Sequence, residues 1–265
     1  MTLFGLTLFP DLSPGAIGAL VAIYFLAFLL KGMFGLGAMP PLVIFGSWVV
    51  GPHHAVVLAV IANVFSQIQF TPEGLRHGDL RLVRSLVLAY IPATILGVWI
   101  FGRLESDWLT AVVGAVLVGI LSLEGSPMMR RYDAAIQQHT AVLGPVMSAV
   151  SGIVGGVAGA GGVLLVSAYV RMVCSEPRVL RASIILIATV FIMWRTVVYA
   201  FNGLVPLSIL VECVLLLPVI VVGGHTGFRL FGRFPKERFF FAFRIFLIVA
   251  SLNLVVKGLV SAFFG

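Results

Sequence analysis

Residues 155–162 read Gly-Gly-Val-Ala-Gly-Ala-Gly-Gly, inside an apolar run that extends from about residue 140 to about residue 173. Each glycine costs a helix interior about 1 kcal/mol relative to alanine, so this stretch predicts that a helix breaks here. A second stretch, GMFGLGAMPP at residues 32–41, interrupts the first apolar segment in the same way, reinforced by two prolines. Inside a bilayer, unwound backbone survives only where protein or a water-filled cavity satisfies its polar groups. Paired breaks therefore indicate a transport site.

The composition is typical of a membrane protein that crosses the bilayer several times. Of the 265 residues, 60% are hydrophobic and only 10% are charged, whereas soluble domains contain about 25% charged residues. Apolar stretches of bilayer-spanning length recur from end to end, which predicts an all-α integral membrane protein. The net charge of +7 fits basic cytoplasmic loops as well as an anionic substrate, and loops are the simpler explanation. No basic–aromatic pattern of a nucleic-acid-binding protein is present.

Hydrophobic runs and turn signals predict five helical segments in each half of the chain. They span residues 15–31, 36–50, 54–71, 82–102 and 107–122, and then 140–155, 160–174, 179–201, 205–231 and 237–260. We therefore predict an N-terminal transmembrane repeat at residues 1–123, a cytoplasmic linker at 124–139 and a C-terminal transmembrane repeat at 140–265. Segments next to the breaks are short for a hydrocarbon core of ~30 Å, which favours half-helices that meet near its midplane.

The spacing of glycine and proline indicates an internal duplication. Pro52 lies 15 residues after Gly37, and Pro177 lies 15 residues after Gly162. The triplet Phe-Gly-Arg also occurs in both halves, at residues 101–103 and 231–233. Because these matches follow the same order in each half, we predict two repeats, each of which opens with a glycine-rich broken helix pair.

Lysine and arginine in the loops predict how the repeats are oriented. The basic loop at residues 76–84 and the central linker are expected in the cytoplasm, and the uncharged turn at residues 201–205 is expected outside. In the internal duplication, the turn at residues 201–205 of the second half corresponds to the basic loop at residues 76–84 of the first half. The repeats are therefore predicted to have inverted topology, with both chain termini outside.

The two breaks form the predicted substrate site. Segments 36–50 and 160–174 begin at the breaks, and a helix N-terminus carries about half a positive charge with unpaired N–H donors that suit anion oxygens. The alternative is that the glycines only permit close packing of helices. The candidate binding glycines are Gly35, Gly37, Gly159, Gly161 and Gly162.

Polar side chains inside apolar segments are further candidates for binding. Asn63 and Gln67 share one helix face with Ser66, which predicts either a cavity lining or links between helices. Arg195 lies deep in its segment, and a charge at such a depth suggests function. Its side chain could instead snorkel to the outer surface.

Lys31 and Glu212 are the candidate charge partners within the membrane. Either could neutralise the other, and Glu212 could also pair with Arg195 or carry a coupling proton. The histidines at positions 53, 54 and 225 are expected to be solvated or packed and not to act as ligands. The two cysteines show no metal-binding spacing, so we predict neither a metal site nor a cofactor.

Motifs of membrane-embedded enzymes are absent from the sequence. It contains no H-E-x-x-H, no G-x-S-x-G and no pair of aspartates on apolar segments. We therefore expect that the protein is not an enzyme. The alternatives left open are an organic-anion uptake permease and a membrane-embedded enzyme that acts on a lipid-linked substrate.

The repeats resemble those of the sulfite exporter TauE/SafE family over nearly the whole chain. The resemblance rests on the two breaks, Phe34-Gly35-Leu36-Gly37 and Gly159-Ala160-Gly161-Gly162, and on a later Pro-x(4)-Gly helix that ends in Gly-Arg. The first break departs from the family's fuller glycine run, because Ala38 and Met39 are followed by two prolines.

The resemblance implies a bacterial inner-membrane permease that moves small sulfur-containing anions, such as sulfite, sulfoacetate or other organosulfonates, by alternating access. Its partners would be the anionic substrate, the lipid bilayer and coupling protons. The sequence leaves open whether the protein forms an oligomer, which anion it moves and in which direction.

Overall fold

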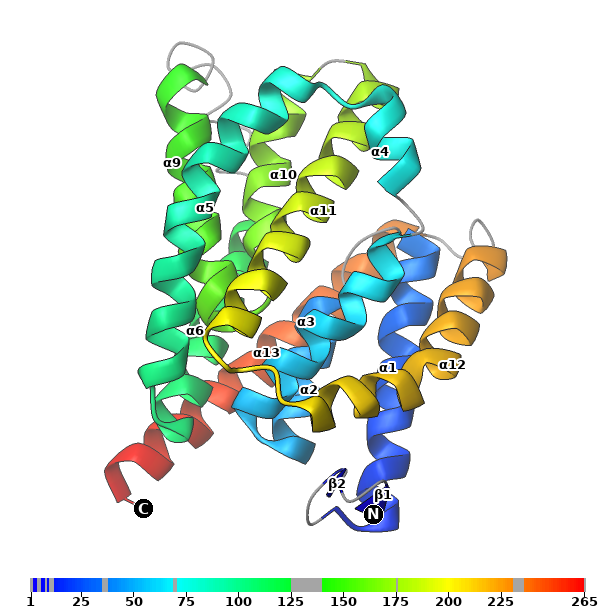
Figure 1. Ribbon diagram of the computed structural model, residues 1–265, viewed down its shortest axis with the longest axis vertical. Coiled ribbons are helices and arrows are strands. Elements are labelled where there is room, and N and C mark those ends of the chain that lie inside the picture. Colours follow the sequence, from blue (N-terminus) through cyan, green and yellow to red (C-terminus); the bar gives the residue numbers. More distant parts are fainter. Residues whose placement is uncertain are drawn as a thin grey trace. The chain divides into compact units, whose positions relative to one another are not determined.

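The computed structural model describes residues 2–3, 6–7, 9, 12–34, 38–68, 71–124, 140–174, 176–230 and 236–264 (Figure 1). The first half forms a two-residue antiparallel strand pair and then six helices: β1 (Thr2–Leu3), β2 (Leu6–Thr7), α1 (Pro14–Phe34), α2 (Met39–Val50), α3 (Pro52–Ile68), α4 (Thr71–His77), α5 (Leu80–Arg103) and α6 (Ser106–Glu124). The second half forms α9 (Thr140–Ala158), α10 (Gly162–Val173), α11 (Pro177–Phe201), α12 (Leu207–Leu230) and α13 (Lys236–Phe264).

Every helical segment predicted from the sequence is present, with ends that differ by a few residues. Six helices are long and apolar enough to cross a membrane: α1, α5, α6, α11, α12 and α13. The apolar helices α2, α3, α9 and α10 are shorter, as predicted for the segments near the breaks. The predicted linker lies outside the described residues except for Glu124.

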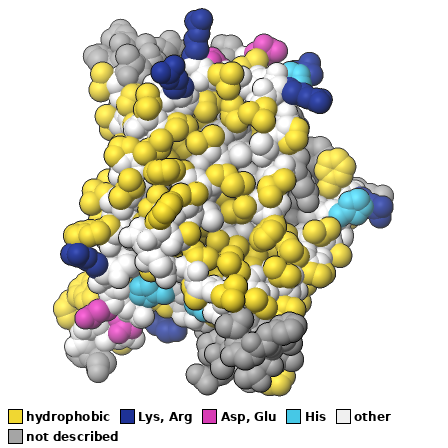
Figure 2. Space-filling view, in the orientation of Figure 1, with side chains coloured by type: hydrophobic (Ala, Val, Ile, Leu, Met, Phe, Trp, Pro, Cys, Tyr) yellow, Lys and Arg dark blue, Asp and Glu magenta, His cyan; other side chains and the backbone are white. Residues whose placement is uncertain are grey.

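The surface of the described residues is that of a multi-pass membrane protein. Large apolar side chains are exposed on several helices, among them Phe201 at 88%, Phe228 at 71% and Leu88 at 63%. Figure 2 shows hydrophobic side chains over most of one face, with charged side chains toward the margins of the view. Such a surface would aggregate in water but is stable against lipid.

At both glycine-rich stretches one helix ends and the next begins, as the sequence predicts. α1 ends at Phe34 and α2 begins at Met39, with prolines in its first turn, where their missing N–H has no helical partner. α9 ends at Ala158 and α10 begins at Gly162. Gly159 and Gly161 lie between them with positive φ angles of 68° and 86°, which glycine adopts without steric cost.

The chain divides into two compact units, each assembled from both halves of the sequence. Unit 1 comprises Met1–Ser66, Glu105–Ala115 and Gly203–Gly265, and unit 2 comprises Gln67–Leu104 and Val116–Asn202. In unit 1, α1 packs along α12, and in unit 2, α9 packs along α5. In each unit, therefore, the first helix of one half packs on a later, proline-containing helix of the other half.

Glycines allow close approach at both of these helix pairs. A Cβ added to Gly32 of α1 would overlap the backbone of Gly224 in α12, and one added to Gly97 of α5 would overlap the backbone of Ile153 in α9. The two pairings have the pattern expected of a duplicated chain, and the inverted orientation of the repeats stays a prediction. Within unit 1, the first turn of α1 and the last turn of α13 lie toward the same end (Figure 1).

Candidate functional site

At the second break, in unit 2, the guanidinium of Arg195 forms hydrogen bonds with backbone carbonyls. Nη1 of Arg195, on α11, donates hydrogen bonds to the carbonyl oxygens of Gly155 at 3.1 Å and Gly159 at 2.6 Å. These carbonyls lie at and just after the C-terminal end of α9, where the helix dipole is negative, and the carbonyl of Gly155 also accepts the N–H of Gly159 at 3.0 Å. Only 5% of Arg195 is exposed, so its side chain is buried at the break and does not snorkel to the surface.

The same break retains hydrogen-bond donors that have no acceptor. Nε of Arg195 is buried and has no hydrogen-bond partner among the described residues. The first bonds of α10 are donated by Leu164 and Leu165 to the carbonyl of Gly161, so the N–H groups of residues 160–163 precede the bonded part of the helix, where donors have no helical acceptor. Buried donors without partners are rare in proteins, and donors beside a helix N-terminus suit the oxygens of an anion.

Two tyrosines that the sequence analysis did not single out complete the surroundings of Arg195. The hydroxyl of Tyr199 donates to the carbonyl of Gly156 at 2.6 Å, and the ring of Tyr90 stacks on Phe191 with a centroid distance of 3.5 Å. Tyr199 lies one helical turn after Arg195 on α11, so both side chains reach the end of α9. That i, i+4 spacing is a signal that could have identified it.

The glycines of this break also serve packing. A Cβ on Gly161 would overlap the side chain of Ile120, and one on Gly162 would lie 2.6 Å from the carbonyl oxygen of Ser151. The hydroxyl of Ser151 in turn donates to the carbonyl of Gly162 at 2.6 Å. Close packing and unpaired N–H donors, which the sequence analysis weighed as alternatives, therefore occur together in the same four residues.

Gly161→Ala should destabilise the protein more than Gly203→Ala does. Both positions have positive φ, which costs an alanine about 1–2 kcal/mol. Gly203 has no atom within 4 Å of an added Cβ, whereas Gly161 faces Ile120, and such overpacking adds about 1–3 kcal/mol. Thermal unfolding in one detergent measures the difference, and equal losses in the two variants would contradict this packing role.

The first break, in unit 1, is flanked by a buried lysine. Only 6% of Lys31 is exposed, and its Nζ donates a hydrogen bond of 2.8 Å to Oδ1 of Asn63. The Asn63 amide also donates to the carbonyl of Ala59 at 3.2 Å and to Sδ of Met39 at 2.6 Å. Asn63 therefore links α3 to both helices of the break. The predicted binding glycines Gly35 and Gly37 lie outside the described residues.

Gln67 links helices in unit 2. Its Nε2 donates to Oγ1 of Thr189 at 3.2 Å and to the carbonyl of Ile185 at 3.4 Å, both on α11. The polar face of the segment at residues 54–71 thus connects helices, which is one of the two roles predicted for it. Between Asn63 and Gln67, Oγ of Ser66 is buried with no partner among the described residues.

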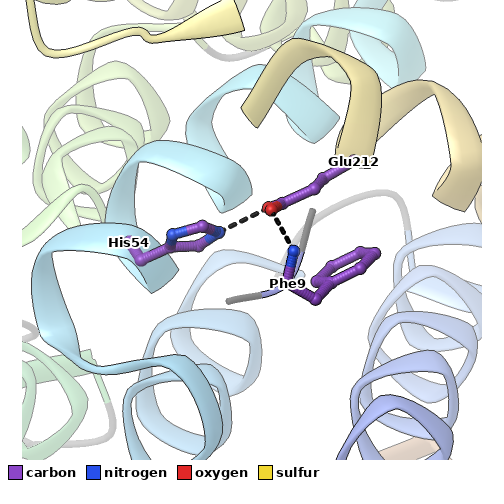
Figure 3. A network of polar contacts seen from close by, with 3 residues as sticks. All are labelled: Phe9, His54 and Glu212. Carbon is purple, nitrogen blue, oxygen red and sulfur yellow. Dashed lines mark hydrogen bonds and ion pairs between the residues drawn. The ribbon is translucent and has the colours of Figure 1, made fainter. Parts of the chain in front are cut away.

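Glu212 pairs with neither Lys31 nor Arg195, the basic residues considered as its partners. It accepts hydrogen bonds from the backbone N–H of Phe9 and from His54 (Figure 3), while Lys31 is bound to Asn63 and Arg195 to the end of α9. His54, expected to be solvated or packed, is instead the partner of the buried carboxylate. A histidine after Pro52 and a glutamate in an apolar helix gave no signal that they would meet, because 158 residues separate them.

Within the described residues, no group of three or more His, Cys, Asp or Glu side chains could hold a metal ion. Each break, taken by itself, has a buried basic side chain, Lys31 in unit 1 and Arg195 in unit 2. Such side chains, and the backbone donors at the start of α10, suit an anion.

Comparison with known proteins agrees with this chemistry. The chain is 26% identical over 182 residues, 65% of its own length and 69% of the relative's, to the probable sulfite/organosulfonate exporter TauE of Cupriavidus necator. No solved structure matches the chain. A profile described as sulfite exporter TauE/SafE matches residues 20–254, which is most of the chain. This protein therefore belongs to the sulfite exporter TauE/SafE family of membrane transporters.

Proposed function

We propose that this protein carries small sulfur oxyanions, such as sulfite or an organosulfonate, across the bacterial inner membrane by alternating access. The two helix breaks bind the anion, with Arg195 and the start of α10 at one break and Lys31 at the other.

One observation carries this proposal: each break has a buried basic side chain without a carboxylate partner among the described residues. Arg195 binds only backbone carbonyls, and Lys31 binds the amide of Asn63. A charge inside a membrane segment is costly and is retained mainly where a pathway or substrate needs it. An anionic substrate would supply the missing negative charge.

The donors at the second break fit an anion with several oxygens. A guanidinium presents its N–H groups in a planar fork that matches such oxygens, and Nε of Arg195 has no partner. The N–H groups at the start of α10 add donors with the positive end of a helix dipole behind them. The related exporter from Cupriavidus necator, named for sulfite and organosulfonates, supports the same class of substrate.

Flux measurements in proteoliposomes test the proposal. Labelled sulfite, sulfoacetate and taurine are offered separately, with and without a proton gradient, and protein-free vesicles give the leak. We expect saturable flux of at least one of these anions. Flux indistinguishable from the leak for all three would contradict the proposal, and the direction favoured by the gradient would separate export from uptake.

A further inference from the structure

The hydroxyl of Ser66, in the last turn of α3, is a buried polar group of unit 1 that has no partner. The residue is 8% exposed, and its Oγ makes no hydrogen bond with any described residue. A buried polar group that is left unsatisfied destabilises a protein, so such groups are rare and each one needs an explanation.

The other buried serines and threonines of the described chain all have a hydrogen-bond partner. Five of them donate to the carbonyl four residues earlier in their own helix: Ser47, Thr94, Thr110, Thr189 and Ser251. Three donate to other carbonyls, and one accepts a backbone N–H: Ser148, Ser151, Ser167 and Ser183. The carbonyl of Ala62 offers Ser66 the same local bond, but its hydroxyl does not make it.

The ammonium of Lys31 supplies unpaired donors and a charge close to Ser66. Asn63 precedes Ser66 by three residues, so the two side chains are neighbours on one face of α3. Nζ of Lys31 donates to Oδ1 of Asn63 at 2.8 Å and lies 5.8 Å from the centre of the Phe28 ring. An ammonium has three N–H donors, and the bond to Asn63 uses only one of them.

Asn63 itself has no donor left for a ligand. Its amide nitrogen donates to the carbonyl of Ala59 at 3.2 Å and to Sδ of Met39 at 2.6 Å, while its oxygen accepts from Lys31. Asn63 therefore orients the ammonium. The donors that stay available on this side of unit 1 belong to Lys31 and Ser66.

The charge of Lys31 decides which kind of ligand suits the Ser66 hydroxyl. A hydroxyl can accept from a donor or bind a cation through its lone pairs, or it can donate its proton to an anion. The ammonium repels a cation and attracts an anion, and it has no carboxylate partner among the described residues. A small anion with at least two oxygens can accept from the ammonium and from the hydroxyl at the same time.

We propose that the hydroxyl of Ser66 binds substrate, by donating a hydrogen bond to an oxygen of the anion that neutralises Lys31. The inference rests on the proposed transport function and adds a residue to the unit 1 site. Lys31 supplies the charge, Asn63 holds the ammonium in place, and Ser66 supplies a directional bond. The ligand class is a small sulfur oxyanion, because a sulfonate or sulfite group offers several oxygens to these donors.

Ser66→Ala tests this role, because it removes the hydroxyl without removing any hydrogen bond of the protein without anion. Ethanesulfonate and, separately, sulfite are titrated calorimetrically into the full-length protein in nanodiscs. The affinity should fall about tenfold or more, which is the usual effect of losing a hydrogen bond to a charged group. Without anion, the unfolding temperature should equal or exceed that of the wild type, because an unsatisfied group is removed and alanine favours the helix.

Two further variants make the result specific. Ser66→Cys keeps nearly the same shape but has only a weak donor, so it should bind the anions almost as weakly as Ser66→Ala. Ser251→Ala removes a buried hydroxyl of unit 1 that already donates to the carbonyl of Leu247 at 2.7 Å, and it should bind them as the wild type does. Wild-type affinity in Ser66→Ala or Ser66→Cys would overturn the proposal.

Flux in proteoliposomes separates this inference from the proposed function. If the wild type carries ethanesulfonate and Ser66→Ala binds it with wild-type affinity, the role of Ser66 is refuted and the transport function stands. If the wild type binds the anion through Ser66 but carries none across the membrane, the transport function is refuted and the binding site stands. A wild type that neither binds nor carries either anion would overturn both.

Discussion

Arg195→Lys should abolish the thermal stabilisation that a bound sulfur oxyanion gives to the wild type, while the protein without anion keeps most of its stability. The lysine ammonium can still donate to the carbonyls of Gly155 and Gly159, the two bonds that Nη1 makes. It cannot replace the unpartnered Nε. A lost hydrogen bond to a charged group is worth about 1.5–3 kcal/mol, so affinity should fall by about tenfold to a hundredfold.

Calorimetric titration with sulfite and ethanesulfonate, together with thermal unfolding, measures both effects. Tyr199→Phe is the matched control, because it removes the bond to the carbonyl of Gly156 at the same helix end and leaves the guanidinium intact. It should lower stability by about 1 kcal/mol and leave anion binding unchanged. If Arg195→Lys binds the anion with wild-type affinity, Arg195 only caps the C-terminal end of α9 and does not bind substrate.

Lys31→Met should stabilise the protein and, at the same time, strongly reduce anion flux. Lys31 is buried and is bound to an amide, with no carboxylate partner among the described residues. Replacing a buried charge by an apolar side chain of similar length stabilises proteins by about 1–4 kcal/mol in favourable cases. The Oδ1 atom of Asn63 loses a donor, which offsets about 1 kcal/mol of that gain. If Lys31 binds substrate, the flux should fall at least about tenfold.

Lys257→Met provides the comparison, because Lys257 is exposed on α13. In Lys257→Met, the anion flux and the unfolding temperature should both change less than they do in Lys31→Met. Wild-type flux in Lys31→Met would restrict the anion site to the break at Arg195. A loss of stability would show instead that the bond to Asn63 outweighs the cost of burying the ammonium.

The helices of this protein could be predicted from the sequence because their signals are local. Apolar runs fix where helices form, and glycine and proline fix where they end, through backbone conformations that neighbouring residues do not alter. The break before α10 is the clearest case, since Gly159 and Gly161 both adopt positive φ. The repeat spacing and the family resemblance depend on the same residues.

Short elements escaped prediction because packing stabilises them. α4 has seven residues, too few to be stable as an isolated helix. It packs on α11, where a Cβ on Gly74 would lie 3.0 Å from the backbone nitrogen of Leu186. The strand pair β1–β2 is two residues long in each strand and has no hydrophobic period to detect.

The sequence by itself determined the membrane class, the helices, the two breaks and the presence of Lys31, Arg195 and Glu212 inside apolar segments. Only the tertiary structure decided what these charges contact. Arg195 reaches the end of α9, and Glu212 reaches His54 and Phe9, across 36 to 203 residues of chain. A buried charge takes whichever partner helix packing places within hydrogen-bond distance, and that choice depends on contacts between segments that no local pattern encodes.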